Sequence, residues 1–322
     1  MTQVYRIGLL GASKIARTAI IAPVRDDARF VVTAVAARDP ERARAYAAEH
    51  GIASVADSYE TLIGRDDVYV IYNGLPPAGH AEWSIAALEA GKAVLCEKPF
   101  ARNADEARAM VAASTATGRP LIEAFHYRFH TVMRRAEELV RQGALGTLQR
   151  GLGEFSVQIP RTPSELRWSQ DLGGGAMMDL GCYPLHAMRT LIGTEPEIAS
   201  AHGNFRKGAD ARMRADLIFP GGVQVLIACS MVATAPIARL WLEGARGRLE
   251  IVNFIAPQMG CRFTTTIDGE TLAHPTEGPS TYAAQLDHLY EVLTGAAEPL
   301  TGGADAIATM TAIDAIYGAA RR

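Results

Sequence analysis

The stretch VYRIGLLGASKIA, Val4–Ala16, decides the fold class of this chain. Its strand pattern ends at Leu10, and the next residues read Gly-Ala-Ser-Lys-Ile-Ala. Gly11 permits a tight turn, and small residues at the next two fingerprint positions let the backbone approach a pyrophosphate and the helix pack closely. The alternative is an ordinary strand-to-helix turn. We predict a dinucleotide-binding turn whose cofactor contacts come from Gly11, Ala12, Ser13, Lys14 and Ile15.

Outward from this turn, short apolar runs alternate with amphipathic helical stretches up to Ala124. The predicted strands are Val4–Leu10, Phe30–Ala36, Val68–Tyr72, Ala93–Cys96 and Leu121–Ala124. The predicted helices are Ser13–Ala22, Pro40–His50, His80–Ala90 and Asp105–Thr117. Strand and helix in strict alternation predict an α/β fold with a doubly wound parallel sheet, so residues 1–124 are expected to form a Rossmann domain.

From Phe125 the pattern changes to one helix, Val132–Arg141, and then to longer strand-like runs separated by glycine turns. These runs are Gly151–Ile159, Ala211–Phe219, Val223–Val232 and Arg239–Glu243. They predict an α+β domain over 125–322 with a large open, mainly antiparallel sheet. The helical segments Asp179–Ile192, Ala283–Leu293 and Asp305–Tyr317 are expected to cover one side, with 305–317 also a candidate to pack back on the first domain.

The composition limits the kinds of partner and the cellular compartment that the sequence indicates. The 322 residues include 32 Lys and Arg against 35 Asp and Glu, a formal charge of −3, so neither a nucleic-acid nor a membrane partner is indicated. Neither a secretory signal pattern nor an apolar run of membrane-spanning length is present in the sequence, which favours a cytoplasmic protein. The four cysteines are widely separated and predict neither zinc ligation nor a disulfide framework.

The end of the second predicted strand bears on cofactor choice. An NAD site usually carries an acidic residue there, but this chain reads Val35-Ala36-Ala37-Arg38-Asp39. Ala37 removes the repulsion that a 2′-phosphate would meet, and Arg38 offers a forked cation. We therefore predict a preference for NADP(H), with NAD(H) also accepted. A two-residue shift would bring Asp39 to the ribose, although Asp39-Pro40 is more typical of a helix N-cap.

Two further motifs complete the pattern. Glu97-Lys98-Pro99 closes an apolar strand, where an ammonium would face a ligand held at the strand ends. Later the chain reads Gly173-Gly174-Gly175, followed by Asp179, Gly181 and Tyr183.

Together these motifs, in this order and spacing, resemble the Gfo/Idh/MocA oxidoreductases over almost the whole chain. Pro76-Pro77 with His80, Tyr127-Arg128-Phe129-His130 and Arg167-Trp168 are also similar to that family. Tyr183 in place of a histidine resembles the branch that contains glucose-fructose oxidoreductase, NADP-dependent xylose dehydrogenase and dihydrodiol dehydrogenase. The resemblance implies a hydride-transferring enzyme for a sugar, polyol or diol, and it adds Pro76, His80, Glu97 and Lys98 to the expected cofactor contacts.

The expected chemistry assigns roles to a few side chains. Lys98 would polarise the reacting oxygen, and Tyr183 would exchange its proton. Asp179 is either an N-cap or a group that holds substrate or orients Lys98. Arg167 would bind a polar substrate or pair with Glu165, and His186 would relay a proton or be structural. The expected substrate contacts are therefore Lys98, Arg167, Trp168, Asp179, Tyr183 and His186.

Other interpretations stay open. His126 and His130, with Glu123 nearby, have a spacing that a metal site would use, but no zinc motif surrounds them, so we predict no metal. Two other functions are a glycosidase that uses NAD redox transiently and a catalytically silent dinucleotide-sensing protein. An open sheet face would be a natural oligomer surface, so we expect a homodimer or homotetramer.

Overall fold

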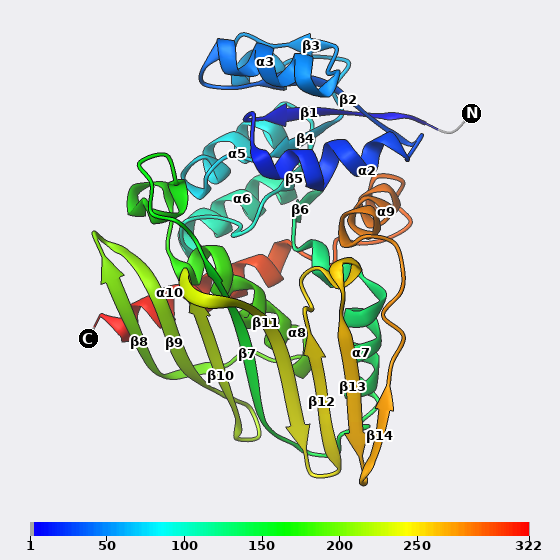
Figure 1. Cartoon of the computed structure of the whole chain (residues 1–322). Helices are drawn as coiled ribbons and strands as arrows, with labels where there is room; N and C mark the ends of the chain where they lie inside the picture. Colours follow the sequence, from blue (N-terminus) through cyan, green and yellow to red (C-terminus); the bar gives the residue numbers. More distant parts are fainter. Residues whose placement is uncertain (1–2, 322) are drawn as a thin grey trace. The chain divides into compact units, whose positions relative to one another are not determined.

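The computed structural model describes residues 3–321, and they form two compact units (Figure 1). The first unit contains the chain up to Ala124 together with Tyr282–Ile307. The second contains Phe125–Thr281 and the chain from Ala308 onward. Residues 1, 2 and 322, which the predicted domain spans include, lie outside the described residues.

The first unit is built on a six-stranded parallel sheet in the order β3-β2-β1-β4-β5-β6, which is a Rossmann arrangement. Strands β4 and β5 are buried at every residue, because helices cover both faces of the sheet. The short elements β3 and α4 are additions to the predicted pattern. The strands are β1 (Tyr5–Leu10), β2 (Phe30–Ala36), β3 (Ser54–Val55), β4 (Val70–Asn73), β5 (Ala93–Cys96) and β6 (Leu121–Glu123).

The helices of this unit begin at polar caps. Ser13, Asp39, Ser58 and Asn103 each accept a backbone N–H bond at the start of a helix. The helices are α1 (Lys14–Ala16), continued by a π-helical turn (Arg17–Ile21) and α2 (Ala22–Arg25), then α3 (Pro40–His50), α4 (Tyr59–Ile63), α5 (His80–Glu89) and α6 (Ala104–Thr117).

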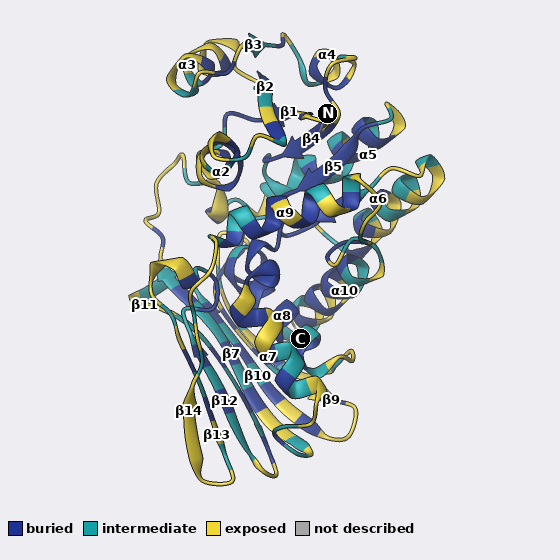
Figure 2. Cartoon of the chain, turned by 90° about the vertical axis from the view of Figure 1, so that its right-hand side faces the viewer, coloured by how far each residue is buried: buried dark blue, intermediate teal, exposed yellow. Residues whose placement is uncertain are grey.

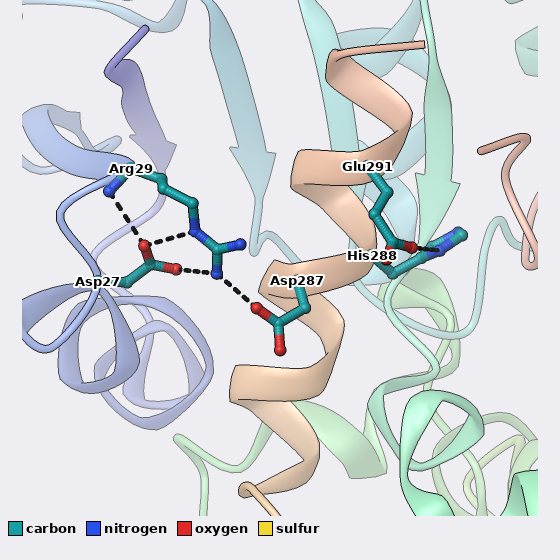
Figure 3. Close-up of polar contacts among 5 residues, drawn as sticks. All are labelled: Asp27, Arg29, Asp287, His288 and Glu291. Atoms are coloured by element: carbon teal, nitrogen blue, oxygen red, sulfur yellow. Dashed lines mark hydrogen bonds and ion pairs between the residues drawn. The ribbon is translucent and has the colours of Figure 1, made fainter. Parts of the chain in front are cut away.

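Helix α9 (Thr281–Leu293) packs in the first unit, so the prediction that Ala283–Leu293 covers the second sheet is wrong. Its apolar side chains Leu286, Leu289 and Val292 join the core of the parallel sheet. Arg29 donates to Asp27 at 2.7 Å and to Asp287 of α9 at 2.5 Å (Figure 3). The helix packs in this unit because the parallel sheet buries its apolar side chains and Arg29 pairs with its Asp287.

The second unit is built on an eight-stranded sheet in the order β14-β13-β12-β11-β7-β10-β9-β8. All its strand pairs are antiparallel except β7 with β10, so the predicted fold class is confirmed. Strands β8, β12, β13 and β14 were outside the predicted set. The strands are β7 (Leu148–Gln158), β8 (Glu197–Arg206), β9 (Ala209–Phe219), β10 (Val223–Ser230), β11 (Val232–Gly244), β12 (Gly247–Val252), β13 (Arg262–Ile267) and β14 (Glu270–Ala273).

Helices cover one face of this sheet (Figure 2). They are α7 (Thr131–Arg141), a π-helical turn (Met177–Gly181) that leads into α8 (Cys182–Ile192), and α10 (Gly303–Ala320), which belongs to this unit from Ala308. Val223, Val225, Ile227 and Cys229 of β10 are buried toward α8, and the residues between them are less buried. This alternation is the signature of a sheet with one covered face.

Candidate active site

Three turns meet at the carboxyl edge of the parallel sheet in the first unit. The Gly11 N–H donates to the Ala36 carbonyl at 2.8 Å, and the Gly74 N–H donates to the Leu10 carbonyl at 3.2 Å. The Glu97 N–H donates to the Asn73 carbonyl at 3.0 Å. The segments after β1, β4 and β5 are thereby joined at the edge where doubly wound sheets bind ligands.

The Gly11 turn has the geometry that a dinucleotide pyrophosphate needs. Gly11 has φ +87°, which strains any residue with a side chain, and a Cβ there would lie only 3.0 Å from Leu75 Cδ2. Ser13 Oγ accepts the Ala16 N–H at 3.3 Å at the start of helical residues Lys14–Arg25. A tight turn of small residues, followed directly by a helix N-terminus, fits the phosphates of a nicotinamide dinucleotide.

Arg38 lies exposed just beyond the end of β2, beside the Gly11 turn. Asp39 caps α3, because its carboxylate accepts the Glu41 N–H at 3.0 Å and the Arg42 N–H at 3.4 Å. The alternative role of Asp39 as a ribose ligand is therefore disfavoured. Arg42, which the sequence did not single out, donates to the Ala12 carbonyl at 2.7 Å and ties α3 to the turn.

The Glu97-Lys98-Pro99 segment is fixed by a buried hydrogen bond. Tyr72 Oη donates to Glu97 Oε1 at 2.7 Å, and both residues are buried. Burial, reinforced by the Glu97 charge, raises the pKa of Tyr72 well above its ordinary value, so the phenol stays a donor. Lys98 is half-buried, and the Lys98–Pro99 peptide is cis. These contacts indicate that Glu97 steadies the turn that carries Lys98.

His80 joins two of the turns at the carboxyl edge of the parallel sheet. The sequence predicts cofactor contact for it, but the ring is 0% exposed and both nitrogens face backbone carbonyls. Nε2 lies 2.8 Å from the Leu75 oxygen and Nδ1 lies 2.9 Å from the Pro99 oxygen. Burial lowers the pKa of this imidazole. His80 therefore ties the turn after β4, which holds the half-buried Pro76, to the turn that carries Lys98.

Tyr282, at the start of α9, is a neighbour of this turn that the sequence did not indicate. Burial, reinforced by the Glu97 charge and opposed by the Lys98 charge, raises the pKa of Tyr282 to about 12. The phenol is thus within electrostatic range of both residues. More than 180 positions separate them in the sequence, so no local pattern could have paired them.

In the second unit the glycine triplet allows a close backbone approach. A Cβ on Gly174 would lie 2.5 Å from the Arg167 oxygen, and a Cβ on Gly175, which has φ +136°, would lie 2.1 Å from Asp210 Oδ1. Asp210 accepts the Met177 N–H at 2.8 Å and the Tyr317 hydroxyl at 2.6 Å. Asp210 therefore takes the capping position that the sequence offered to Asp179.

Asp179 and Arg167 lie together in the second unit. Arg167 Nη1 is 3.6 Å from Asp179 Oδ2, and its other contacts go to Glu165, with Nη2 at 2.7 Å from Oε2. Hydrogen bonding to Glu165 raises the pKa of Arg167 above its ordinary value. Trp168 is buried, donates its indole N–H to the Ile159 carbonyl at 3.3 Å, and carries the Arg161 guanidinium over its ring. The Trp168 ring therefore packs against Ile159 and Arg161 of the same segment. The sequence predicts, by contrast, that Trp168 contacts substrate.

Tyr183 contacts His126, whose spacing in the sequence suggested only a metal ligand. Tyr183 Oη lies 3.3 Å from His126 Nε2, and His126 Nδ1 lies 2.8 Å from Thr281 Oγ1. All three residues are buried. The sequence gave no signal for the contact between Tyr183 and His126, because 57 positions separate the two residues.

His186 contacts a different tyrosine. Its Nδ1 lies 2.5 Å from Tyr127 Oη, and its ring stacks on Phe125 with centroids 4.2 Å apart. His186 is thus hydrogen-bonded to Tyr127, whereas Tyr183 is hydrogen-bonded to His126. This division favours a structural role for His186.

Residues 3–321 contain no group of three or more His, Cys, Asp or Glu side chains arranged to hold a metal ion. Among the same residues, none of the helices combines the length and hydrophobicity required to cross a bilayer.

Comparison with known proteins identifies the family. Residues 5–125 match the model for the oxidoreductase family with an NAD-binding Rossmann fold, and residues 133–250 match the GFO/IDH/MocA C-terminal domain. The chain belongs to the GFO/IDH/MocA oxidoreductase family. The predicted family is confirmed, and the protein is an NAD(P)-dependent oxidoreductase.

Similar members of the GFO/IDH/MocA family act on small hydroxylated molecules. D-xylose 1-dehydrogenase (NADP(+)) 2 of Haloferax volcanii is 32% identical over 97% of this chain and 96% of its own. The trans-1,2-dihydrobenzene-1,2-diol dehydrogenase of Mus musculus is 34% identical over 78% of this chain and 76% of its own. The crystal structure of aldose-aldose oxidoreductase from Caulobacter crescentus with glycerol has a TM-score of 0.89 at 29% identity, covering 99% of this chain and 98% of that one.

Proposed function

We propose that this chain is an NADP-preferring dehydrogenase or reductase that moves hydride between nicotinamide and a hydroxyl-bearing carbon of a sugar, polyol or vicinal diol. The observation that carries the proposal is the edge of the parallel sheet where the Gly11 turn and the Glu97-Lys98-Pro99 turn lie together. The names of the xylose and dihydrodiol dehydrogenases support the substrate class. The first unit would bind the cofactor, and the second unit the substrate.

Cofactor choice follows from charge at the end of β2. Residues Gly11–Ile15 would hold the pyrophosphate, and exposed Arg38, with no carboxylate at Ala37, would receive a 2′-phosphate. NADP, when bound, supplies or accepts the hydride. NAD would use the same turn without the ion pair to Arg38, so it would bind more weakly.

The reacting oxygen needs a positive charge and a proton partner. Lys98 would polarise this oxygen, held in place by the turn that Glu97 and His80 fix. Tyr183 would give the proton in reduction and take it in oxidation. Arg167 and Asp179, which lie together in the second unit, would bind further substrate hydroxyls.

The open face of the eight-stranded sheet is the surface that we propose for homodimer or homotetramer formation. It carries half-buried Leu152, Leu226 and Trp241 among charged residues, and Arg248 covers the Trp241 ring at 4.3 Å. Apolar side chains on a sheet face are the usual material of a subunit interface. Light scattering of the purified protein would report the subunit number, and a monomer at all concentrations would contradict this proposal.

Purified protein mixed with NADPH and a panel of aldoses, diols and diketones tests the proposed function. We expect NADPH to bind, as seen in its fluorescence, more tightly than NADH, and nicotinamide absorbance to change with one substrate class. Absence of NADPH binding would contradict the proposal. Glycoside cleavage with retained NAD and no net absorbance change would identify a transient-redox glycosidase, and binding without turnover on any substrate would identify a sensing protein.

A further inference from the structure

A row of hydrogen bonds starts at Tyr183 and lies within the second unit. Tyr183 Oη and His126 Nε2 are 3.3 Å apart, His126 Nδ1 and Thr281 Oγ1 are 2.8 Å apart, and Gln258 Nε2 lies 3.4 Å from the same Thr281 oxygen. The first three residues are buried and Gln258 is exposed. None of the roles derived above uses His126, Thr281 or Gln258.

The direction of this row follows from the hydrogen atoms available. The Gln258 amide nitrogen can only donate, so Thr281 Oγ1 accepts there, and the Thr281 N–H, 3.5 Å from Gln258 Oε1, keeps the amide in this orientation. The Thr281 side chain is 0% exposed, and a buried hydroxyl hydrogen without an acceptor is costly. Of its two side-chain partners described above, only His126 Nδ1 can accept that hydrogen.

An imidazole that accepts at Nδ1 carries its hydrogen at Nε2 when it is neutral. His126 therefore donates to Tyr183 Oη, and Tyr183 keeps its own hydrogen for another acceptor. The distance of 3.3 Å is long for an N–H···O bond and would shorten once the oxygen is charged. Every donor in the row thus points toward the Tyr183 oxygen.

We infer that His126 is a positioning residue that stabilises the tyrosinate form of Tyr183, with Thr281 and Gln258 fixing its tautomer. The inference rests on the proposed function and deepens it. In reduction, the carbonyl carbon would receive the hydride as a C–H bond of the reduced nicotinamide breaks and the nicotinamide is oxidised, while the Tyr183 O–H bond breaks and its proton bonds to the carbonyl oxygen. The tyrosinate that remains accepts the His126 N–H until solvent returns a proton.

A matched pair of variants tests the role. His126→Met keeps the length of the side chain and removes the donor, whereas His126→Gln keeps an N–H donor near the same place. We expect His126→Met to lower kcat about 10- to 100-fold, with KM changing less than threefold, and His126→Gln to recover most of that loss. The pH at which activity reports Tyr183 ionisation should rise by about one unit or more in His126→Met.

A second readout does not depend on turnover. The near-ultraviolet absorbance of tyrosinate, taken as the difference between each protein and its Tyr183→Phe counterpart, gives the pKa of Tyr183 directly. We expect a higher pKa in His126→Met than in the unsubstituted chain, a smaller rise in Thr281→Val, and little change in Thr281→Ser. His130→Asn is the control, since it replaces a buried histidine of the same segment and can still cap α7.

These readouts separate the inference from the proposed function. If the pKa of Tyr183 is the same in His126→Met and in the unsubstituted chain, the inference is wrong, whatever the enzyme does. If the chain turns over none of the panel but His126→Met still raises that pKa, the proposed function fails and the hydrogen-bond role stands. Circular dichroism of each variant shows whether the fold is retained, and for a His126→Met protein that misfolds, the Thr281→Val and Thr281→Ser pair decides.

Discussion

Backbone turns make the candidate site of the first unit, whereas side chains from separate segments make that of the second. At the edge of the parallel sheet, Gly11, Gly74 and Glu97 are joined by main-chain hydrogen bonds. Tyr183 contacts His126, and His126 in turn contacts Thr281; these two partners lie on either side of Tyr183 in the sequence. A turn is specified by a few adjacent residues, whereas a network of side chains depends on the path of the whole chain. This difference explains which parts of each site a sequence can reveal.

The largest expected effect comes from removing the reacting group of each unit. Lys98→Ala and Tyr183→Phe should each lower kcat by about 10²- to 10⁴-fold, because one loses the charge and the other the proton at the reacting oxygen. NADPH affinity, measured by fluorescence titration, should stay within about threefold for Tyr183→Phe. Turnover that survives both substitutions would remove the catalytic roles proposed for these two side chains.

Gly175→Ala should destabilise the second unit by about 3 kcal/mol. The new Cβ would lie 2.1 Å from Asp210 Oδ1, and the backbone has φ +136°. Gly143→Ala is the matched control, since Gly143 has φ +71° but no atom within 4 Å of its Cβ, so only the backbone cost of about 1 kcal/mol applies. Urea unfolding of both variants gives the difference, and equal losses would show that the loop yields around the glycine triplet.

Arg38→Ala tests the cofactor half of the comparison. We expect the Kd for NADPH to rise about 10- to 100-fold while the Kd for NADH hardly changes, because only NADPH carries the 2′-phosphate. Calorimetric titration with both cofactors measures this ratio. An equal loss for both would mean that Arg38 contacts a part that the two dinucleotides share.

The smallest expected effect concerns the attachment of α9 to the first unit. Arg29 joins Asp27 to Asp287 and lies 4.8 Å from the Tyr290 ring centroid, so Arg29→Met should cost about 1 kcal/mol after allowance for solvent screening (Figure 3). Arg44→Met, which removes an exposed pair with Glu41, should leave Tm unchanged.

The same cluster gives a pH dependence with a defined sign. Hydrogen bonding from Arg29 lowers the pKa of Asp27 below its ordinary 3.8. Its stabilising contribution is therefore present above pH 3.8 and is lost as pH falls through the lower pKa of the folded state. Thermal unfolding of the unsubstituted chain and Arg29→Met should converge below that range. A difference in Tm that persists at lower pH would show that packing, and not the ion pair, holds Arg29.

The sequence misassigned or missed elements for physical reasons. Leu286, Leu289 and Val292 give α9 an apolar face, but periodicity does not say which sheet receives that face. Strand β3 has only two residues, too few to show a period. Strands β12 to β14 are short and separated by tight turns, and β14 is exposed throughout, so it lacks the apolar alternation that predicts a strand.

The residues of the candidate site also fall into two groups, those that the sequence indicated and those that it missed. Gly11, Lys98 and the glycine triplet could be proposed from the sequence because each depends on adjacent residues with a distinctive backbone requirement. The sequence did not predict the electrostatic effect of Lys98 on Tyr282 or the contact between His126 and Tyr183, since the residues of each pair are distant in the chain. The sequence predicts that His80 and Trp168 contact ligands. In the structure both side chains are buried, and their ring nitrogens face backbone carbonyls.

By itself the sequence determined the fold class, the dinucleotide turn and the family, because repeated burial and glycine turns leave a local record. The tertiary structure alone decided that α9 belongs to the first unit and that Asp210 caps the helix after Gly175. It also decided that Tyr183 is paired with His126 and His186 with Tyr127. Such pairings are set by the fit and hydrogen bonding of surfaces that meet only when the chain is folded, and a local pattern carries no information about that meeting.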